Sequence, residues 1–471
     1  MNDIKRTKII CSIGPSSENV ETLVEMVNAG MNVVRVNFSH GDVNEYIRIK
    51  ENVEKVRKIT KKEIGLLYDT KGPDFRLGEI EGGFIELNEG DKIKLLKKGT
   101  IGSKDGLVFN YGSVIKKLKK HDTVLLNDGL IVLEVISTDI NGVNTKVLSG
   151  GKLSSHKGAF IPGVDLGIPF LSNQDKEDIK YACQNNGDFL ALSFVSCKKD
   201  VLDVRKILKE NNSNMLIISK IENKNGLNNL DEIIDVSDGI MVARGDLGVE
   251  MPMEELPIIQ KLLIQKCREK GKICIVATEM LASMESAPRP TRAEISDVAN
   301  AVLDGCDSVM LSGETTVGKH PVETVAYMSK ICCQAEEFYD YEYNFDYEHD
   351  KAITAGIAKA VVAAIEEIDC KAVVVPTMGG HSARVMSNLK TRPIIVAPCP
   401  SVEVARKLSL CFGVIPTVVP LLDDFNQLTE ISIKESKKIL NLEEGDTIII
   451  TGGIHKKREP NQTNFLKIEE I

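Results

Sequence analysis

The chain has no tryptophan, few aromatic residues and no long apolar run. Only 5% of its 471 residues are aromatic, and no uninterrupted apolar stretch approaches the roughly 20 residues of a membrane span. The apolar run near the start of the sequence ends at Gly14 and Pro15, too early for a secretion signal. We therefore expect no membrane partner and a cytoplasmic location.

Cysteine motifs and excess positive charge are also missing. The eleven cysteines include no Cys-x-x-Cys pair, and the adjacent Cys332 and Cys333 do not make a metal site. Cys11, Cys274 and Cys411 stand inside apolar runs, which is typical of small buried residues in a reducing compartment. A formal net charge of −9 argues against a general nucleic-acid binder.

Short apolar runs alternate with helical patterning along most of the chain. They cover residues 8–14, 33–39, 64–70, 188–195, 214–222, 238–245, 272–280 and 308–314. Near-continuous apolar strands separated by amphipathic helices predict a parallel sheet covered by helices. Eight such units predict a closed (β/α)8 TIM barrel, and an open doubly wound sheet is the alternative.

The third and fourth predicted strands are too far apart for one connecting helix. The stretch between them contains alternating runs and an Asn-Asp-Gly turn signal, which predict a small β-barrel lid domain inserted in the barrel. An acidic, aromatic stretch near residue 340 indicates a further boundary, followed by a separate α/β domain. The predicted domains are residues 1–73 with 162–340 (barrel), 74–161 (lid) and 351–471 (C-terminal regulatory or oligomerisation domain).

Polar residues collect at the carboxyl ends of the predicted strands, where barrel active sites form. They are Arg35, Asn37, Ser39, Asp69, Thr70, Lys220, Glu222, Arg244, Gly245, Asp246, Thr278 and Glu279. A buried charge without a partner is costly, so these groups must neutralise one another or hold a ligand. A ring of salt bridges is the structural alternative, with Arg35 paired to Asp69 and Lys220 to Glu222. A ring of salt bridges does not explain why the neutral polar residues Asn37, Ser39 and Thr278 stand at these positions.

The chemistry of these groups suits phosphoryl transfer. Glu222 and Asp246 offer the two carboxylates that suit Mg²⁺ with open positions. Lys220 is a point charge that can meet a phosphate oxygen. One carboxylate and several neutral oxygens from a further set could hold a monovalent cation; this set comprises Asn37, Ser39, Asp69 and Thr70. Clamping an anionic ligand in this way is the main device of phosphoryl-transfer catalysis.

One glycine-rich stretch is a false lead. Residues 313–320, GETTVGKH, match the start of a Walker A loop, but that loop needs Ser or Thr where His320 stands. We predict a strand-to-helix turn instead, with Pro321 in the first helical turn.

Long motifs along the whole chain resemble the pyruvate kinase family. They are TKIICSIGPSS, GMNVVRVNFSHG, DTKGP, IISKIEN, DGIMVARGDLGVE, MLASM, PRPTRAEISDVANAVLDG and VMLSGET, in this order. The resemblance implies an enzyme that transfers the phosphoryl group of phosphoenolpyruvate to ADP, giving pyruvate and ATP. It also implies a homotetramer, which nothing in the composition shows.

The resemblance assigns roles to the rim residues. Glu222 and Asp246 match the ligands of Mg²⁺ (or Mn²⁺), and Lys220 matches the group that stabilises the phosphoryl in flight. The remaining matches are Arg35 as the phosphoryl clamp, Gly245, Asp246 and Thr278 at the substrate carboxylate, and Asn37, Ser39, Asp69 and Thr70 at K⁺. Asn37, His40, Arg76 and Lys157 match positions that reach the nucleotide, with which a second Mg²⁺ is expected. Whether Thr278 relays the proton to the enolate stays open.

A few positions depart from the family pattern. Glu279 stands where Gln is common, Tyr68 where Leu is common, and Asp74 where many members have Glu. An acidic residue at this last position tends to accompany K⁺ dependence in the family, so we expect activation by K⁺.

The family's C-terminal domain often binds a sugar-phosphate effector. The matching loop is 376–384 at a predicted helix start, where backbone N–H groups favour phosphate. Its candidate residues are Thr377, Gly379, Gly380 and Ser382. The last loop, 451–464, lacks most of the expected glycines but carries the basic run His455 to Arg458. The identity of the effector, if there is one, stays open.

Two other functions compete with the kinase. A Mg²⁺-dependent lyase or aldolase acting on pyruvate enolates would use the Glu222 and Asp246 pair but would not need Lys220, the K⁺ set or a lid. A non-catalytic homologue would have lost some of the five central residues, all of which are present: Arg35, Lys220, Glu222, Asp246 and Thr278.

Overall fold

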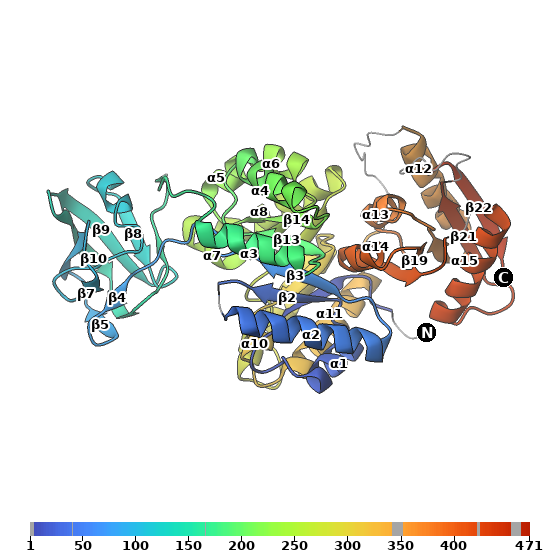
Figure 1. The fold of residues 1–471 in the computed structure, drawn as a ribbon, viewed down its shortest axis with the longest axis horizontal. Coiled ribbons are helices and arrows are strands. Elements are labelled where there is room, and N and C mark those ends of the chain that lie inside the picture. Colours follow the sequence, from blue (N-terminus) through green and yellow to red (C-terminus); the bar gives the residue numbers. More distant parts are fainter. Residues whose placement is uncertain (1–3, 40, 165, 342–351, 422–423, 454–462) are drawn as a thin grey trace.

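The central part of the molecule is a closed barrel of eight parallel strands (Figure 1). The computed structural model describes residues 4–39, 41–164, 166–341, 352–421, 424–453 and 463–471. The strands are β1 Lys8–Ser12, β2 Val33–Asn37, β3 Gly65–Asp69, β13 Phe189–Leu192, β14 Leu216–Ile221, β15 Gly239–Ala243, β16 Ile273–Ala277 and β17 Ser308–Leu311. Each lies within its predicted run. The barrel is confirmed, and the open doubly wound sheet is wrong.

Helices cover the outside of the barrel. They are α1 Val20–Ala29, α2 Val43–Thr60, α3 Asn173–Gln184, α4 Lys198–Glu210, α5 Lys224–Asn228, α6 Leu230–Val236, α7 Arg244–Glu250, α8 Leu256–Glu269, α9 Arg292–Leu303, α10 Gly313–Thr316 and α11 Pro321–Glu337. Ser172 and Thr291 begin α3 and α9 with capping boxes, which satisfy the first free N–H groups. The predicted turn in place of a Walker A loop is confirmed, because α10 leads into α11 with Pro321 in its first turn.

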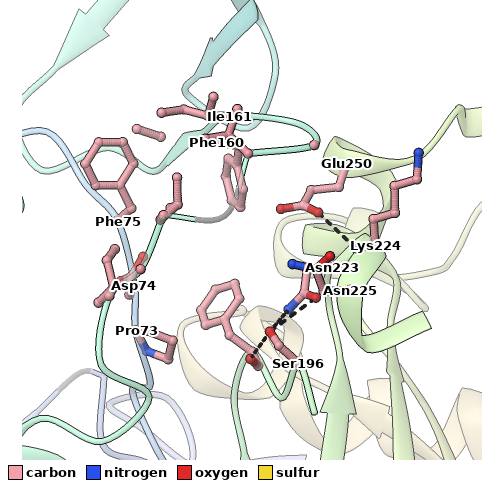
Figure 2. Close-up of a pocket in the computed structure, with 17 residues that line it drawn as sticks. Pro73, Asp74, Phe75, Phe160, Ile161, Ser196, Asn223, Lys224, Asn225 and Glu250 are labelled. Carbon is pink, nitrogen blue, oxygen red and sulfur yellow. Dashed lines mark hydrogen bonds between the residues drawn. The ribbon is translucent and has the colours of Figure 1, made fainter. Parts of the chain in front are cut away.

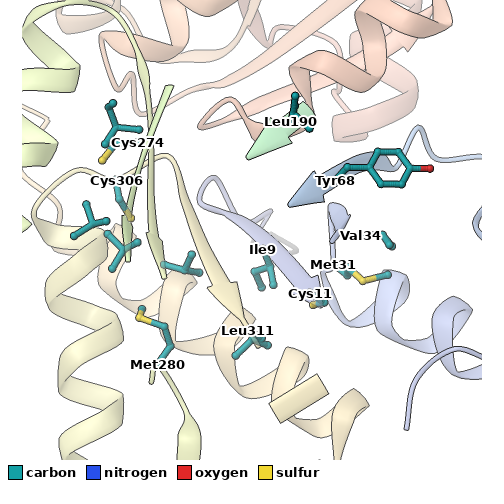
Figure 3. Close-up of a cluster of buried hydrophobic side chains, with 14 of the residues drawn as sticks. Ile9, Cys11, Met31, Val34, Tyr68, Leu190, Cys274, Met280, Cys306 and Leu311 are labelled. Atoms are coloured by element: carbon teal, nitrogen blue, oxygen red, sulfur yellow. The ribbon is translucent and has the colours of Figure 1, made fainter. Parts of the chain in front are cut away.

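The core of the barrel has two layers because successive strand residues face opposite sides. Ile9 and Cys11 of β1 pack outward with Leu311 of β17 against the helices, as Figure 3 shows. Ile10 faces inward, in a cluster that fills the barrel and continues to Val414 in the C-terminal region. The C-terminal region therefore closes the end of the barrel at which the strands begin.

The segment between β3 and α3 is a separate β structure, drawn at the left of Figure 1. Its elements are β4 Glu79–Ile80, β5 Phe84–Leu87, β6 Lys92–Leu96, β7 Ile101–Gly102, η1 Val114–Lys117, β8 Thr123–Leu126, β9 Ile131–Thr138, β10 Gly142–Ser149, β11 Gly151–Ser154 and β12 Ala159–Phe160. They form a five-stranded sheet, β12-β8-β9-β10-β6, and two pairs. The predicted Asn127-Asp128-Gly129 turn joins β8 to β9 with three positive φ angles. We call this segment the lid.

The C-terminal region is an α/β unit at the right of Figure 1. Its elements are α12 Ala352–Glu367, β18 Cys370–Val374, α13 His381–Asn388, β19 Ile394–Cys399, α14 Val402–Lys407, η4 Leu408–Leu410, β20 Val414–Val418, α15 Phe425–Leu440, β21 Thr447–Gly452 and β22 Phe465–Glu470. The sheet order is β20-β19-β18-β21-β22, and β22 is antiparallel to β21. The domain boundaries suggested by the sequence stay predictions. Within the described ranges, no helix is long and apolar enough to cross a membrane.

Candidate active site

Four charged side chains form one buried network at the rim where the barrel strands end. The Nε of Arg35 on β2 donates to Oδ2 of Asp69, the last residue of β3, over 2.7 Å. The Nζ of Lys220 lies 3.2 Å from Oδ1 of Asp69 and 3.0 Å from Oε1 of Glu222. Both pairs of the salt-bridge alternative therefore form, and Asp69 joins them. All four residues are buried.

The network sets the charges of Lys220, Asp69 and Glu222. Burial opposes ionisation of Lys220, but Asp69 and Glu222 outweigh it, so the pKa of Lys220 is raised. Burial also opposes ionisation of Asp69, but Lys220 and Arg35 hold the pKa of Asp69 below its usual value. Burial raises the pKa of Glu222 to about 7; Lys220 opposes this shift, and the carboxylate of Asp246 adds to it. Lys220 is therefore a fixed positive charge beside a carboxylate that lacks full compensation.

Glu222 and Asp246 fit a small divalent cation. Burial raises the pKa of Asp246 as well, against the opposing effect of Lys220. A buried carboxylate and a half-buried one, the second of which disfavours the charge of the first, have the chemistry of a Mg²⁺ donor set. Over the part of the chain that the structure describes, no group of three or more His, Cys, Asp or Glu could hold a metal. A cation bound here would complete its shell with water and substrate oxygens.

The residues after β15 differ from the sequence expectation in their local structure. Arg244, Gly245 and Asp246 were expected at a strand end, and they form the first turn of α7 instead. The N–H groups of a first helical turn have no partner within the helix. The Gly245 N–H donates to the Thr278 hydroxyl over 2.7 Å, and that hydroxyl donates to the Ala277 carbonyl. Gly245 and Thr278 are thus brought together as predicted.

Thr278 is held in an unfavourable backbone conformation. Its φ is 71° and that of Glu279 is 54°, in the left-handed region that a β-branched residue rarely adopts. Arg244 stabilises this turn because its Nη2 donates to the Thr278 carbonyl over 2.7 Å. Its Nη1 pairs with Asp297 of α9 at 2.6 Å. Arg244, predicted at the rim without a role, fixes the turn that carries Thr278.

The predicted monovalent-cation residues lie at the ends of two neighbouring strands, with Ser39 and Thr70 just beyond them. Asn37 at the end of β2 is paired in register with Asp69 of β3. The Asn37 Oδ1 accepts the N–H of Ser39 over 3.0 Å, and Thr70 follows Asp69 as a buried residue. One carboxylate with neutral oxygens is a donor set that suits a weakly hydrated monovalent cation. His40 lies outside the described residues.

The lid carries two of the predicted nucleotide residues, Arg76 and Lys157. Arg76 forms an ion pair with Asp74 and donates to the His156 carbonyl over 3.2 Å. It also faces Gly158 across an antiparallel bridge, next to Lys157, whose side chain is exposed. Asp74 lines the same cleft as Phe194 and Glu250 of the barrel, so this part of the lid faces the barrel mouth.

An open cleft separates the lid from part of the rim (Figure 2). It holds about 800 Å³ of empty space. Asp74, Phe75 and Phe160 line it from the lid, while Phe194 and Glu250 line it from the barrel side. The chain enters and leaves the lid along this cleft.

Three residues of the site, Ser12, Ser193 and Phe194, are not among those predicted from the sequence. Ser12 accepts a hydrogen bond from Nη1 of Arg35 at 2.7 Å. Ser193 accepts one from Nζ of Lys220 at 2.7 Å, and the Phe194 N–H donates to Oε2 of Glu222 over 2.6 Å. Hydroxyl groups at the ends of the apolar runs 8–14 and 188–195 were the available signal.

The predicted effector loop is largely occupied by its own contacts. The Thr377 hydroxyl accepts the N–H of Gly380, which precedes α13 with a φ of 80°. The Ser382 hydroxyl accepts a hydrogen bond from the Thr463 hydroxyl over 2.7 Å. Gly379 lies between them in the chain and is exposed. The basic residues from His455 to Arg458 lie outside the described residues.

Two family models match most of the chain. One, described as the pyruvate kinase barrel domain, matches residues 4–325, and the other, the pyruvate kinase alpha/beta domain, matches residues 355–469.

Individual proteins match over nearly the whole chain. A pyruvate kinase of Sporosarcina psychrophila is 42% identical, and the match covers 99% of this chain and 81% of that protein. One of Bacillus licheniformis is 43% identical, with coverages of 99% and 80%. The crystal structure of a pyruvate kinase from Cryptosporidium parvum is similar, with a TM-score of 0.93 at 37% identity. That match covers 100% of this chain and 97% of the other.

Proposed function

The chain belongs to the pyruvate kinase family, and we propose that it transfers the phosphoryl group of phosphoenolpyruvate to ADP, giving pyruvate and ATP in the last step of glycolysis. The observation that carries the proposal is the buried Lys220 ammonium, held between Asp69 and Glu222 at the barrel rim. A fixed positive charge beside a metal-binding carboxylate is what a phosphoryl group in transfer requires.

Phosphoenolpyruvate would bind with its phosphoryl group against Lys220 and Arg35. Both cations are already fixed by Asp69, so little reorganisation is needed when negative charge builds up. Glu222 and Asp246 would hold Mg²⁺ or Mn²⁺, which would neutralise substrate oxygens. Asn37, Ser39, Asp69 and Thr70 would hold K⁺ beside the same network.

The substrate carboxylate would bind at the first turn of α7. The N–H groups of Gly245 and Asp246 and the Thr278 hydroxyl are the proposed donors. The Gly245 N–H now bonds the Thr278 hydroxyl over 2.7 Å, and the substrate carboxylate would take the place of that contact.

ADP would bind between the rim and the lid. Arg76 and Lys157 lie next to each other on the lid, and Asn37 lies on the rim. Together with His40, these are the proposed nucleotide residues, and a second Mg²⁺ would accompany ADP.

One assay tests the activity. Pyruvate release from phosphoenolpyruvate is expected to require both ADP and Mg²⁺, with ATP formed in equal amount. Pyruvate formation without ADP would contradict the kinase and favour the lyase or aldolase. No turnover under any of these conditions would favour the non-catalytic homologue.

The same assay tests the monovalent cation. Asp74, the residue that suggests K⁺ dependence, is buried and paired with Arg76. We expect a clearly higher rate in K⁺ buffer than in Na⁺ buffer of the same ionic strength. Equal rates in the two buffers would remove K⁺ from the proposal without affecting the phosphoryl transfer.

Three further properties belong to the proposal. We propose a cytoplasmic location, which the eleven free thiols support. We propose a homotetramer, as the family resemblance implies. A sugar phosphate could regulate the enzyme through Thr377, Gly379, Gly380 and Ser382, and the rate measured with candidate sugar phosphates tests this.

A further inference from the structure

Ser193 contacts both ion-binding halves of the rim. It follows β13 directly and is 4% exposed. The Nζ of Lys220 donates to its hydroxyl over 2.7 Å, and the hydroxyl donates to the Thr70 carbonyl over 2.7 Å. The same oxygen lies 3.3 Å from Oδ1 of Asp69. The hydroxyl has one hydrogen, and its shortest acceptor contact is the Thr70 carbonyl, so a chain of bonds runs from Lys220 through Ser193 to Thr70.

The backbone around Ser193 leaves it little freedom. The Ser193 N–H donates to the Thr70 hydroxyl over 3.3 Å, and the Thr70 N–H donates to the Ala191 carbonyl over 3.0 Å. Gly72, with a φ of 69°, passes so close that an added Cβ would lie 2.7 Å from the Ser193 carbonyl oxygen. The segment that leads from β3 into the lid is therefore pressed against Ser193.

The next residue, Phe194, holds Glu222. Phe194 has a φ of 58°, and this conformation aims its N–H at Oε2 of Glu222. Two consecutive residues, Ser193 and Phe194, thus fix the positions of Lys220, Glu222 and Thr70 relative to one another. A backbone in the left-handed region at a non-glycine residue is costly and persists where the surroundings fix it.

We propose that Ser193 is a positioning residue that fixes the Lys220 ammonium relative to the Thr70 carbonyl and so couples the monovalent-cation site to phosphoryl transfer. This inference rests on the proposed function of the same site. Without the hydroxyl, the ammonium keeps Asp69 and Glu222 as its partners, 3.2 and 3.0 Å away. It would be drawn between these carboxylates and away from the substrate phosphoryl group.

The test compares two alanine variants. Ser193→Ala removes the link, and Ser219→Ala is the matched control. Ser219 is also buried and precedes Lys220 on β14, but its hydroxyl bonds Ser237 over 2.7 Å in the helix layer. For Ser193→Ala we expect kcat to fall about 10- to 100-fold, as for a small misplacement of a reacting group. At saturating K⁺, the KM for phosphoenolpyruvate is expected to rise by no more than the factor by which K⁺ tightens phosphoenolpyruvate binding in wild type.

A binding measurement gives a readout apart from turnover. Calorimetry measures the Kd of phosphoenolpyruvate with Mg²⁺ and without ADP, in K⁺ and in tetramethylammonium. Where the two sites are coupled, K⁺ tightens phosphoenolpyruvate binding, and the coupling is reciprocal. We expect wild type and Ser219→Ala to share this K⁺ effect, and Ser193→Ala to lose most of it. Ser193→Thr, which keeps the hydroxyl, is expected to restore part of both the coupling and kcat.

The outcomes separate this inference from the proposed function. If wild type is inactive with phosphoenolpyruvate and ADP, the proposed function itself fails. If wild type is active and Ser193→Ala matches Ser219→Ala in kcat and in the K⁺ effect, only the role of Ser193 fails. Should Ser193→Ala not fold, Ser193→Cys, which keeps the size with a weakly bonding thiol, carries the same expectations and the same contradiction.

Discussion

At the scale of single residues, Lys220 explains why a buried strand ends with an ammonium and a carboxylate side by side. Its partners are two carboxylates and one hydroxyl, and the two carboxylates raise its pKa despite burial. A lysine of this kind keeps its proton at neutral pH and acts as a fixed charge. Burying such a cluster contributes little to stability, since removing charges from water costs about as much as their attraction returns.

Lys220→Ala is expected to reduce turnover far more than it perturbs the fold. Loss of a preorganised charge at the transferring group reduces kcat by at least about 100-fold, comparable to the loss of one oxyanion-hole donor. Steady-state kinetics with phosphoenolpyruvate and ADP measures this, and circular dichroism checks that the helix content is retained. A folded variant with nearly wild-type kcat would show that Lys220 has no role in phosphoryl transfer.

At the scale of elements, the strands were predictable because their physics is local. A run such as 214–222 is apolar because both faces of a parallel strand are covered, and its polar end reaches the rim by barrel geometry. The first turn of α7 was not predictable, because whether Arg244 to Asp246 continue a strand or open a helix depends on Asp297 and Thr278. The left-handed backbone at Phe194 and Thr278 has no sequence signal either.

The first strand connects the barrel to the C-terminal region through a buried lysine. Lys8 of β1 is 4% exposed, and its Nζ donates to the Val414 carbonyl over 2.7 Å. Burial lowers the pKa of Lys8 to about 7, and the nearby Lys5 adds to the shift. The unfolded chain therefore holds this proton more tightly than the folded chain between pH 7 and the model-peptide value of 10.5. The free energy of unfolding therefore decreases as the pH falls through this window, because protonation of Lys8 favours the unfolded chain.

Lys8→Met is expected to flatten the dependence of stability on pH. In wild type, Lys8 adds a slope of about 1.4 kcal/mol of unfolding free energy per pH unit between pH 7 and 10. Methionine keeps most of the volume and removes the proton. Urea unfolding midpoints at pH 7.5 and 9.5 measure how stability changes with pH. The control is Lys58→Met, at an exposed position of α2. If both variants kept the wild-type pH dependence of stability, the pKa of Lys8 would not be lowered in the folded protein.

At the scale of the whole molecule, the barrel lies between the candidate active site and the C-terminal region. The lid leaves from the strand ends, where the charged network lies, and the C-terminal region packs at the opposite end through Leu410 and Val414. An effector bound beside α13 would therefore have to act through the barrel or through contacts between subunits.

One outer face of the barrel is suited to contacts between subunits. Met253 is 68% exposed, and Ile258 and Leu262 of α8 are 66% and 43% exposed on the same side of the helix. Gln260 and Lys261 of α8 bond Asp304 after α9, so the two helices form one surface. Neighbouring exposed apolar side chains on a folded protein mark interaction sites.

The double variant Ile258→Glu with Leu262→Glu is expected to break up the assembly. Buried, unpaired carboxylates would destabilise an interface by several kcal/mol. Light scattering after gel filtration should give a wild-type mass near four times 51.8 kDa and a smaller mass for the variant. Ile59→Glu, a 58% exposed position on α2, is the control and should keep the wild-type mass. A double variant that keeps the full mass would show that the subunit contacts lie elsewhere. A monomeric wild type would contradict the proposed tetramer.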